Sequence, residues 1–280
     1  MLKNNNKKGV KMTVCIGLLS ENKKQAVAIA DRMITDNYLS IGFEHGDAKI
    51  IRISKNAVAM CAGYTAIISE ILDPIIEENL EKALPIKTLA SKVAESYSEV
   101  RKQKINELYF KPRGLDIDKA YNSNINSQLL KTLDDIVDDF EFPSFEEPAG
   151  LEILIVGVDQ DKKAHLYVVD DPGTFSCRDS IGWMCIGSGS PQAESSLILN
   201  KFNSSKNIKQ ALYFGYEAKK WAEKSPEVGR IETDIVKINQ EVLFLDKENI
   251  NELKRIYEDK EKKLKPIIDR FYSEINKLKL

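Results

Sequence analysis

Residues 12–35 read MTVCIGLLSENKKQAVAIADRMIT, and the pattern of this stretch decides the fold expected for the chain. Two short apolar runs, residues 14–19 and 26–30, flank a polar segment, residues 20–25, that is rich in Glu, Asn and Lys. Apolar runs of strand length that are separated by turn-forming residues predict a β-hairpin.

Polar residues stand at the open end of this hairpin. Thr13 begins the first strand, and Asp31 and Arg32 end the second strand, where a buried strand would ordinarily stay apolar. Because an antiparallel hairpin returns the chain to its starting point, we expect the Thr13 hydroxyl and the Asp31 carboxylate to lie close together.

The whole chain has 280 residues, which is enough to bury a large core. Its formal net charge of −2 gives no indication of a nucleic-acid or membrane-surface partner, and its longest apolar runs have the length of strands. The cysteines lack the spacing of metal ligands and are interpreted as reduced thiols in a cytoplasmic protein. With two histidines and no paired-ligand motif, we expect neither a metal site nor a cofactor. The four cysteines are Cys15, Cys61, Cys177 and Cys185.

The first eleven residues, MLKNNNKKGVK, are polar and basic and contain no apolar core of a signal peptide. One interpretation is a genuine disordered tail. The other is that Met12 is the true start, because residues 8–12 can be encoded as a ribosome-binding site, a spacer and a start codon. Methionine aminopeptidase would then remove Met12 and expose the amine of Thr13. Both interpretations stay open at the level of sequence.

After the hairpin and a mixed loop over 36–47, strand pairs alternate with helix pairs. We expect strands over 49–54, 57–63, 151–158, 164–169, 183–187, 235–238 and 242–245, and helices over 64–84, 86–108, 190–202, 208–224 and 249–280. Ser190 is expected to cap the helix over 190–202. Hairpins beside helix pairs favour antiparallel sheets that are covered by helices.

Two segments stand apart from this alternation. Residues 109–150 form an acidic insert, expected to be a helix and a surface loop over one face. Residues 247–280 form a C-terminal amphipathic helix whose apolar stripe either contacts another copy or folds back on its own domain. The domain itself then spans residues 13–246, and residues 1–12 are a leader or a mis-assigned start. The stripe consists of Leu264, Ile267, Ile268, Phe271, Ile275 and Leu278.

Four segments together resemble proteasome β-type subunits, which are N-terminal-nucleophile (Ntn) hydrolases, including the simpler bacterial proteasome relatives. The segments are TVCIG…AVAIADRMIT, KIIRISKNAVAMCAG, LIVGVDQDKKAHLYVVDDPG and IGSGSP, in this order. The resemblance covers residues 13–84 and 151–245. It implies an α+β fold, a four-layer αββα sandwich of two antiparallel sheets, which agrees with the expected order of elements.

The resemblance also implies a set of functional residues at one end of the sandwich. Thr13 matches the nucleophile, Asp31 the family's aspartate and Lys49 its lysine. Gly63 matches the oxyanion-hole glycine, and Ser188 matches a serine that binds near the threonine's amine. Without the resemblance, these residues read as an ordinary strand residue, a buried ion pair and a strand-to-helix turn.

Two features depart from the family. The usual Asp-x-x-Ser-Gly-Gly is replaced by SPEVGR at 225–230, and Met12 stands where self-cleaving relatives place a glycine. Activity therefore requires the removal of Met12.

The function expected is that of a proteasome-like threonine hydrolase that cleaves peptide or other amide bonds. The alternatives are a catalytically silent subunit that acts in assembly or partner binding, and a small-molecule amidohydrolase; Cys15 is the substitute nucleophile if Thr13 is not one. We expect a homo-oligomer, and an unfoldase partner stays open.

Overall fold

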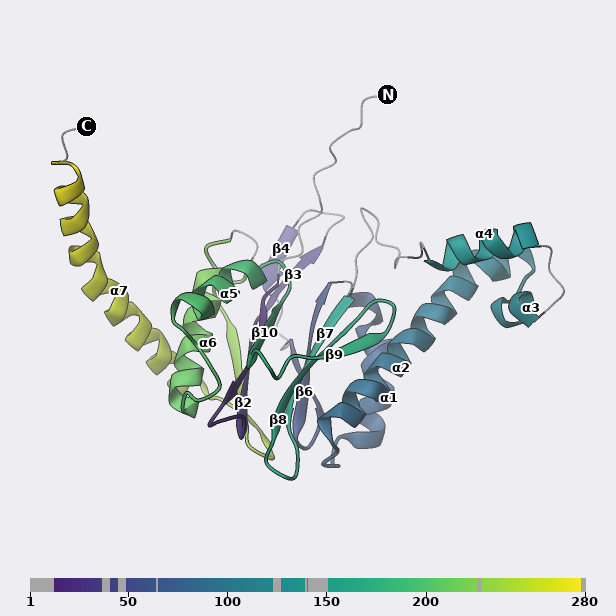
Figure 1. The fold of residues 1–280 in the computed structure, drawn as a ribbon, viewed down its shortest axis with the longest axis horizontal. Helices are drawn as coiled ribbons and strands as arrows, with labels where there is room; N and C mark the ends of the chain where they lie inside the picture. Colours follow the sequence, from purple (N-terminus) through teal and green to yellow (C-terminus); the bar gives the residue numbers. More distant parts are fainter. Residues whose placement is uncertain are drawn as a thin grey trace.

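The computed structural model of the chain describes residues 13–36, 41–44, 49–63, 65–122, 127–138, 140, 151–225 and 228–277. The expected leader, residues 1–12, lies outside the described residues. Within the acidic insert, residues 123–126, 139 and 141–150 also lie outside them. Figure 1 shows the strands gathered at the centre of the molecule and helices on both sides of them.

Two five-stranded antiparallel sheets form the centre of the fold, and they stack face to face. The first sheet has the order β10-β1-β2-β11-β12. Its strands are β10 (Trp183–Ile186), β1 (Cys15–Ser20), β2 (Gln25–Asp31), β11 (Thr233–Ile238) and β12 (Val242–Phe244). The second sheet has the order β5-β6-β7-β8-β9. Its strands are β5 (Ile50–Ser54), β6 (Ala57–Gly63), β7 (Leu151–Val158), β8 (Ala164–Asp170) and β9 (Thr174–Cys177).

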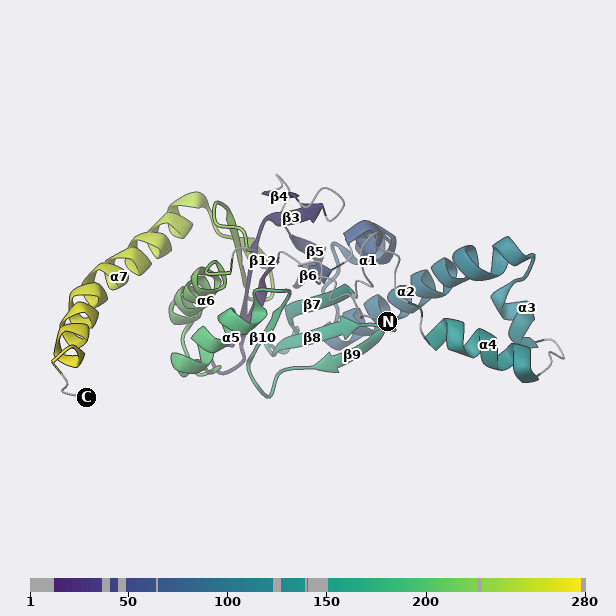
Figure 2. The ribbon, with the colours of Figure 1, turned by 90° about the horizontal axis from the view of Figure 1, so that it is seen from above.

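Helices cover the outer face of each sheet (Figure 2). The second sheet packs against α1 (Ile68–Asn79) and α2 (Ile86–Ile105), and the first sheet against α5 (Ser190–Leu199) and α6 (Ile208–Ala222). Helix α3 (Ile117–Asn122) lies near the end of α2, and α4 (Ser127–Asp138) runs back beside α2, where Arg101 donates to the Val137 carbonyl at 2.9 Å (Figure 2). Helix α7 (Lys247–Ile275) packs on α6. The expected α+β sandwich of two antiparallel sheets with a C-terminal helix is confirmed.

The central strands read as continuous apolar runs because both of their faces are buried. In β2, Ala26, Ala28 and Ala30 face the second sheet, whereas Val27 and Ile29 face the helices. Small residues on the inner face let the two sheets approach closely, and larger ones on the outer face fill the space under α5 and α6. The two strands of the expected hairpin are thus β1 and β2, which are neighbours within the first sheet.

The structure adds strands that the sequence pattern does not predict. Strand β4 (Ile41–Glu44) lies within the mixed loop expected over 36–47 and pairs with β3 (Met33–Asp36). Strand β9 lies at the edge of the second sheet, and its side chains are exposed or half-buried. A short edge strand of this kind has no run of buried apolar residues, so the hydrophobicity pattern of the sequence does not predict it.

Several helix boundaries also differ from expectation. The α-helix expected over 64–84 begins with a 3₁₀ turn at Thr65–Ile67 and ends at Asn79, and α2 is followed by a π-helical turn at Asn106–Phe110. Ser190 is the first residue of α5 and not its cap: Gly189 holds the N-cap position, and no side chain caps this helix.

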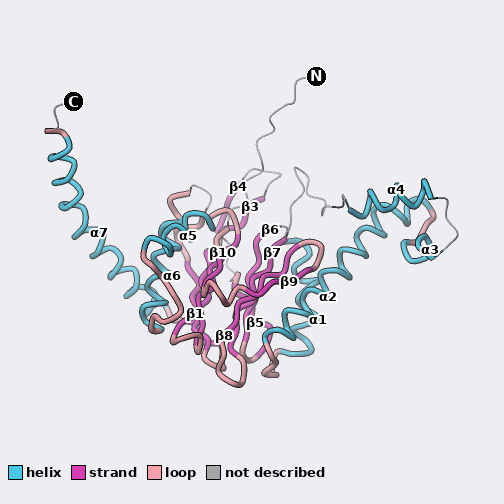
Figure 3. The backbone as a smooth tube through the Cα atoms, in the orientation of Figure 1, coloured by secondary structure: helices cyan, strands magenta, loops and turns pink. Residues whose placement is uncertain are grey.

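Helix α7 behaves differently along its two halves. Asp246 caps its first turn by accepting a hydrogen bond from the Asn249 N–H, and Tyr257 is buried against α6. The second half extends past the body of the protein (Figure 3). The idea that the apolar stripe folds back on its own domain is therefore wrong for its described residues from Leu264 to Ile275, all of which are exposed. Leu278 lies outside the described residues.

Candidate active site

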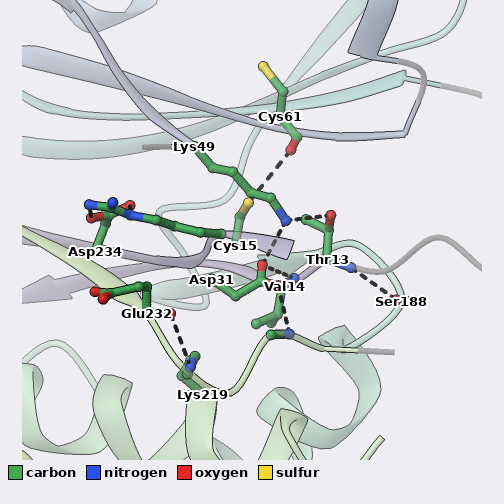
Figure 4. A network of polar contacts seen from close by, with 12 residues as sticks. Thr13, Val14, Cys15, Asp31, Lys49, Cys61, Ser188, Lys219, Glu232 and Asp234 are labelled. Carbon is green, nitrogen blue, oxygen red and sulfur yellow. Dashed lines mark hydrogen bonds and ion pairs between the residues drawn. The ribbon is translucent and has the colours of Figure 1, made fainter. Parts of the chain in front are cut away.

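Three polar side chains from two sheets meet at one end of the sandwich (Figure 4). Thr13 directly precedes β1, Asp31 ends β2, and Lys49 directly precedes β5 of the facing sheet. The Lys49 ammonium reaches across the gap between the sheets and donates to Thr13 Oγ1 at 2.8 Å and to Asp31 Oδ1 at 2.9 Å. The hairpin brings the first two residues together, as expected, and the stacking of the sheets brings the third.

Asp31 is the anchor of this group. Its side chain is fully buried, and its Oδ1 accepts from the Val14 N–H at 3.0 Å in addition to Lys49, while its Oδ2 accepts from the Gly229 N–H at 3.0 Å. A buried carboxylate is costly unless it is paired and hydrogen-bonded, and here both conditions are met. Asp31 thereby holds the Lys49 ammonium beside the Thr13 hydroxyl.

The backbone of Thr13 is held by the turn between β10 and α5. The Thr13 N–H donates to Ser188 Oγ at 3.3 Å, and the Thr13 carbonyl accepts from the Gly189 N–H at 3.0 Å. Gly187 has a φ of +89°, and a Cβ atom at this position would lie 2.4 Å from the Thr13 carbonyl oxygen. Only glycine allows this approach, so the Gly-Ser-Gly sequence serves to seat Thr13.

Gly63 is placed at the end of β6, in the sheet that carries Lys49. Ile50 pairs with Met60 in the antiparallel β5–β6 ladder. Lys49, just before β5, and Gly63, at the end of β6, therefore lie at the same end of these two strands. Gly63 has a φ of +116°, a backbone conformation that residues with a Cβ atom rarely adopt. Its role as an oxyanion donor stays a prediction.

Gly229 is a site residue that sequence reasoning missed. It belongs to the segment 225–230, which lacks the family's Asp and Ser and was therefore treated only as a departure. The contribution is made by the Gly229 backbone N–H to Asp31. A hydrogen bond donated by the backbone does not depend on the type of side chain, so the sequence pattern does not predict it. The presence of a glycine at position 229 was the one feature that could have indicated this contact.

Further ion pairs, buried or half-buried, lie near the site, and the sequence did not indicate them either. Arg32 forms a bidentate ion pair with Asp234 of β11, in which Nε donates to Oδ2 at 2.8 Å and Nη2 donates to Oδ1 at 2.6 Å. Lys219 of α6 is fully buried; it pairs with Glu223 and donates to the Glu232 carbonyl (Figure 4). Desolvation lowers the pKa of Lys219, and the Glu223 carboxylate opposes that change. These pairs tie α6 and the start of β11 to the strands that carry Asp31.

Cys15 is unsuitable as the substitute nucleophile. Its side chain is fully buried between the sheets, and its thiol points to the Cys61 carbonyl at 3.7 Å. Burial raises the pKa of the Cys15 thiol far above its usual range. A thiol without access to solvent or to the thiolate form is unreactive.

Within the part of the chain that the structure describes, no group of three or more His, Cys, Asp and Glu side chains is arranged to hold a metal ion. None of the helices in the same residues combines the length and the hydropathy that crossing a bilayer requires.

Residues 119–218 match the proteasome subunit family. This segment begins within the acidic insert and runs through β7–β10 and α5 into α6. It contains Ser188, whereas Thr13, Asp31 and Lys49 lie outside it. No curated protein matches the chain.

Proposed function

Since the chain is a proteasome-like protein of the Ntn hydrolase family, we propose that it is a threonine hydrolase that cleaves peptide or other amide bonds. The single observation that carries this proposal is the contact of 2.8 Å between the Lys49 ammonium and Thr13 Oγ1, held by the buried Asp31. A cation beside a hydroxyl favours its loss of a proton, and a fully paired aspartate fixes that cation in place.

The nucleophile and its base belong to the same residue once Met12 is gone. A free α-amine has a reference pKa of about 7.7–8.0, so at about neutral pH the exposed amine of Thr13 can accept the hydroxyl proton. Thr13 Oγ1 then attacks the acyl carbon, and the carbonyl electron pair moves onto oxygen. When this intermediate collapses, the C–N bond breaks and the α-ammonium returns the proton to the leaving amine. Water then hydrolyses the resulting ester of Thr13.

Other groups at the site have matching roles in this proposal. Ser188 Oγ, now 3.3 Å from the Thr13 nitrogen, would accept a hydrogen bond from the free amine and aim it at the hydroxyl. Gly63 N–H would face the oxyanion that forms on attack. Asp31 would hold the Lys49 ammonium beside the hydroxyl through their contact of 2.9 Å.

A catalytically silent subunit is the second candidate, and one observation favours it. Ser225 and Val228 stand where the family places the Asp and the Ser before its late strand, so the amine has fewer side-chain partners than the family pattern supplies. With residues 1–12 attached, Thr13 also has no free amine. In either case we propose a cytoplasmic protein that works as a homo-oligomer, as members of this family do.

The test compares two forms of the full chain: one that begins at Met12, so that methionine aminopeptidase exposes Thr13, and one that keeps residues 1–12. Both are treated with a β-lactone, which acylates N-terminal threonines, and intact masses are recorded. We expect one adduct, mapped to Thr13, in the first form only. Thr13→Ala in the first form is the matched control and should remain unlabelled.

Equal labelling of both forms would contradict the mechanism, as would labelling of Thr13→Ala. A folded first form with a proven Thr13 N-terminus and no adduct would favour the silent subunit. The circular dichroism spectrum and melting temperature of each form establish that it is folded.

A further inference from the structure

The second half of α7 presents an apolar face that its own chain does not cover. Beyond Lys260, which pairs with Glu217 of α6, the helix continues to Ile275 away from the body of the protein (Figures 1 and 2). Its large apolar side chains are 38–61% exposed. They are Leu264, Ile267, Ile268, Phe271, Tyr272 and Ile275.

This face continues the seam by which α7 already packs on another helix. In the first half, Ile250, Leu253 and Tyr257 contact α6, at a spacing of three and four residues. Leu264 and Ile268 take up the same spacing, seven and eleven residues beyond Tyr257, and Phe271 and Ile275 extend it. A stripe with this period is complementary to a second helix, so the exposed half has the character of an unpaired helix–helix contact.

The position of the body restricts how a second copy of α7 could approach. The first half of the seam is occupied by α6, so a parallel copy would bring two α6 helices to the same place. An antiparallel copy overlaps only the free halves and leaves the two bodies at opposite ends. In that arrangement Ile268 of each copy faces Phe271 of the other, and Leu264 faces Ile275.

The charges beside the stripe agree with the antiparallel arrangement. Lys263 and Glu274 project on the same flank of the helix, and antiparallel helices bring like flanks together. With Ile268 opposite Phe271, Glu274 of one copy lies within about 3 Å, measured along the axis, of Lys263 of the other. The two-fold symmetry supplies this pair twice, on the flank where Arg270 and Glu274 of each helix also pair with each other at 3.3 Å.

The area is sufficient for a specific contact. If roughly 100 Å² of each of the six half-exposed side chains leaves water, the two copies together bury about 1,200 Å², which reaches the lower range of specific interfaces. We propose that residues 261–275 of α7 form an antiparallel helix pair with the same residues of a second copy of this chain. The contact is independent of the proposed hydrolysis, because none of its residues lies at the Thr13 site.

Photo-crosslinking tests the pairing directly. Benzoylphenylalanine replaces Tyr272 in the full chain, and equal amounts of ¹⁴N- and ¹⁵N-labelled protein are mixed before irradiation. We expect mixed-isotope products whose crosslinks map to residues 264–268 of the other copy. Crosslinks between residues near 272 in both copies would indicate parallel pairing and overturn the proposal. So would crosslinks to the body of the second copy, or the absence of an intermolecular product.

Substitutions in the same crosslinking protein give the matched controls. Ile268→Asp places a charge in the seam and should reduce the crosslink yield at least tenfold, whereas Ser273→Asp adds the same charge on the opposite, exposed face and should leave the yield unchanged. Lys263→Glu and Glu274→Lys should each lower the yield when alone, and a mixture of the two should restore it. An unchanged yield in Ile268→Asp, or no recovery in the mixture, would refute the pairing. Thr13→Ala should crosslink like the parent protein, which keeps this result separate from the outcome of the labelling test.

Discussion

Replacement of Asp31 by Asn removes one negative charge from the centre of the site and keeps the shape of the side chain. In the wild type, the carboxylate accepts from the Lys49 ammonium and from the N–H groups of Val14 and Gly229, at 2.9, 3.0 and 3.0 Å. An amide has one accepting oxygen. If that oxygen serves Lys49 and Val14, the amide NH₂ points at the Gly229 N–H, and two donors face each other in a fully buried place.

The size of the effect follows from that geometry. Breaking a buried ion pair by removing one partner costs about 3–5 kcal/mol, because the other charge stays buried without compensation. The Lys49 side chain is only 12% exposed, so solvent can replace little of the lost interaction. For a chain of this size such a loss lowers the melting temperature by roughly 6–20 °C.

The assay measures stability and reactivity on the same samples. Urea unfolding gives the free energy of unfolding, and the rate of β-lactone addition gives the reactivity of Thr13 in protein that starts at this residue. We expect Asp31→Asn to lower the first by about 3–5 kcal/mol and the second by about 100-fold or more. Thr13→Ala is the control, since it removes one hydrogen bond and should cost about 1 kcal/mol while abolishing addition. An Asp31→Asn protein within about 1 kcal/mol of wild type, or one labelled at the wild-type rate, would refute the reasoning.

The remaining predictions concern the lysine, the turn that seats the threonine and a distant ion pair. Lys49→Met keeps most of the length of the side chain without its charge and should slow β-lactone addition by about 100-fold or more, measured on protein whose fold is verified by circular dichroism. Gly187→Ala forces a Cβ atom toward the Thr13 carbonyl at a φ of +89°, and should cost about 2–4 kcal/mol in urea unfolding and slow addition at least tenfold. His165 donates from Nδ1 to Asp179 at 2.6 Å, and this hydrogen bond, with the neighbouring carboxylates, raises the pKa of His165. The stabilisation is therefore complete below the ordinary histidine pKa of about 6.5 and is lost as the pH rises through the raised value. His165→Asn should be less stable than wild type at pH 5.5 by about 1 kcal/mol and closer to it at pH 9, and an unchanged difference would exclude this histidine as the cause.

Local pattern was sufficient for most of the fold. The hairpin over 12–35 was predictable because two apolar runs and a polar turn are contiguous, and its geometry alone brings Thr13 near Asp31. Lys49 is 36 residues from Thr13 and comes from the other sheet, so its place depended on the resemblance and not on the pattern. Strand β9 was missed because an exposed edge strand carries no apolar run.

What remained belonged to the tertiary structure. The Gly229 N–H meets Asp31 across 198 residues, and Arg32 meets Asp234 across 202, and no periodicity records which backbone donor or carboxylate will fill a buried place. The stripe on α7 shows the same division. Its spacing determined that the helix has an apolar face, but only the tertiary structure decided that Tyr257 is buried and Phe271 exposed. Sequence period is set by the geometry of one helix or strand, whereas burial is set by whichever distant surface that element meets.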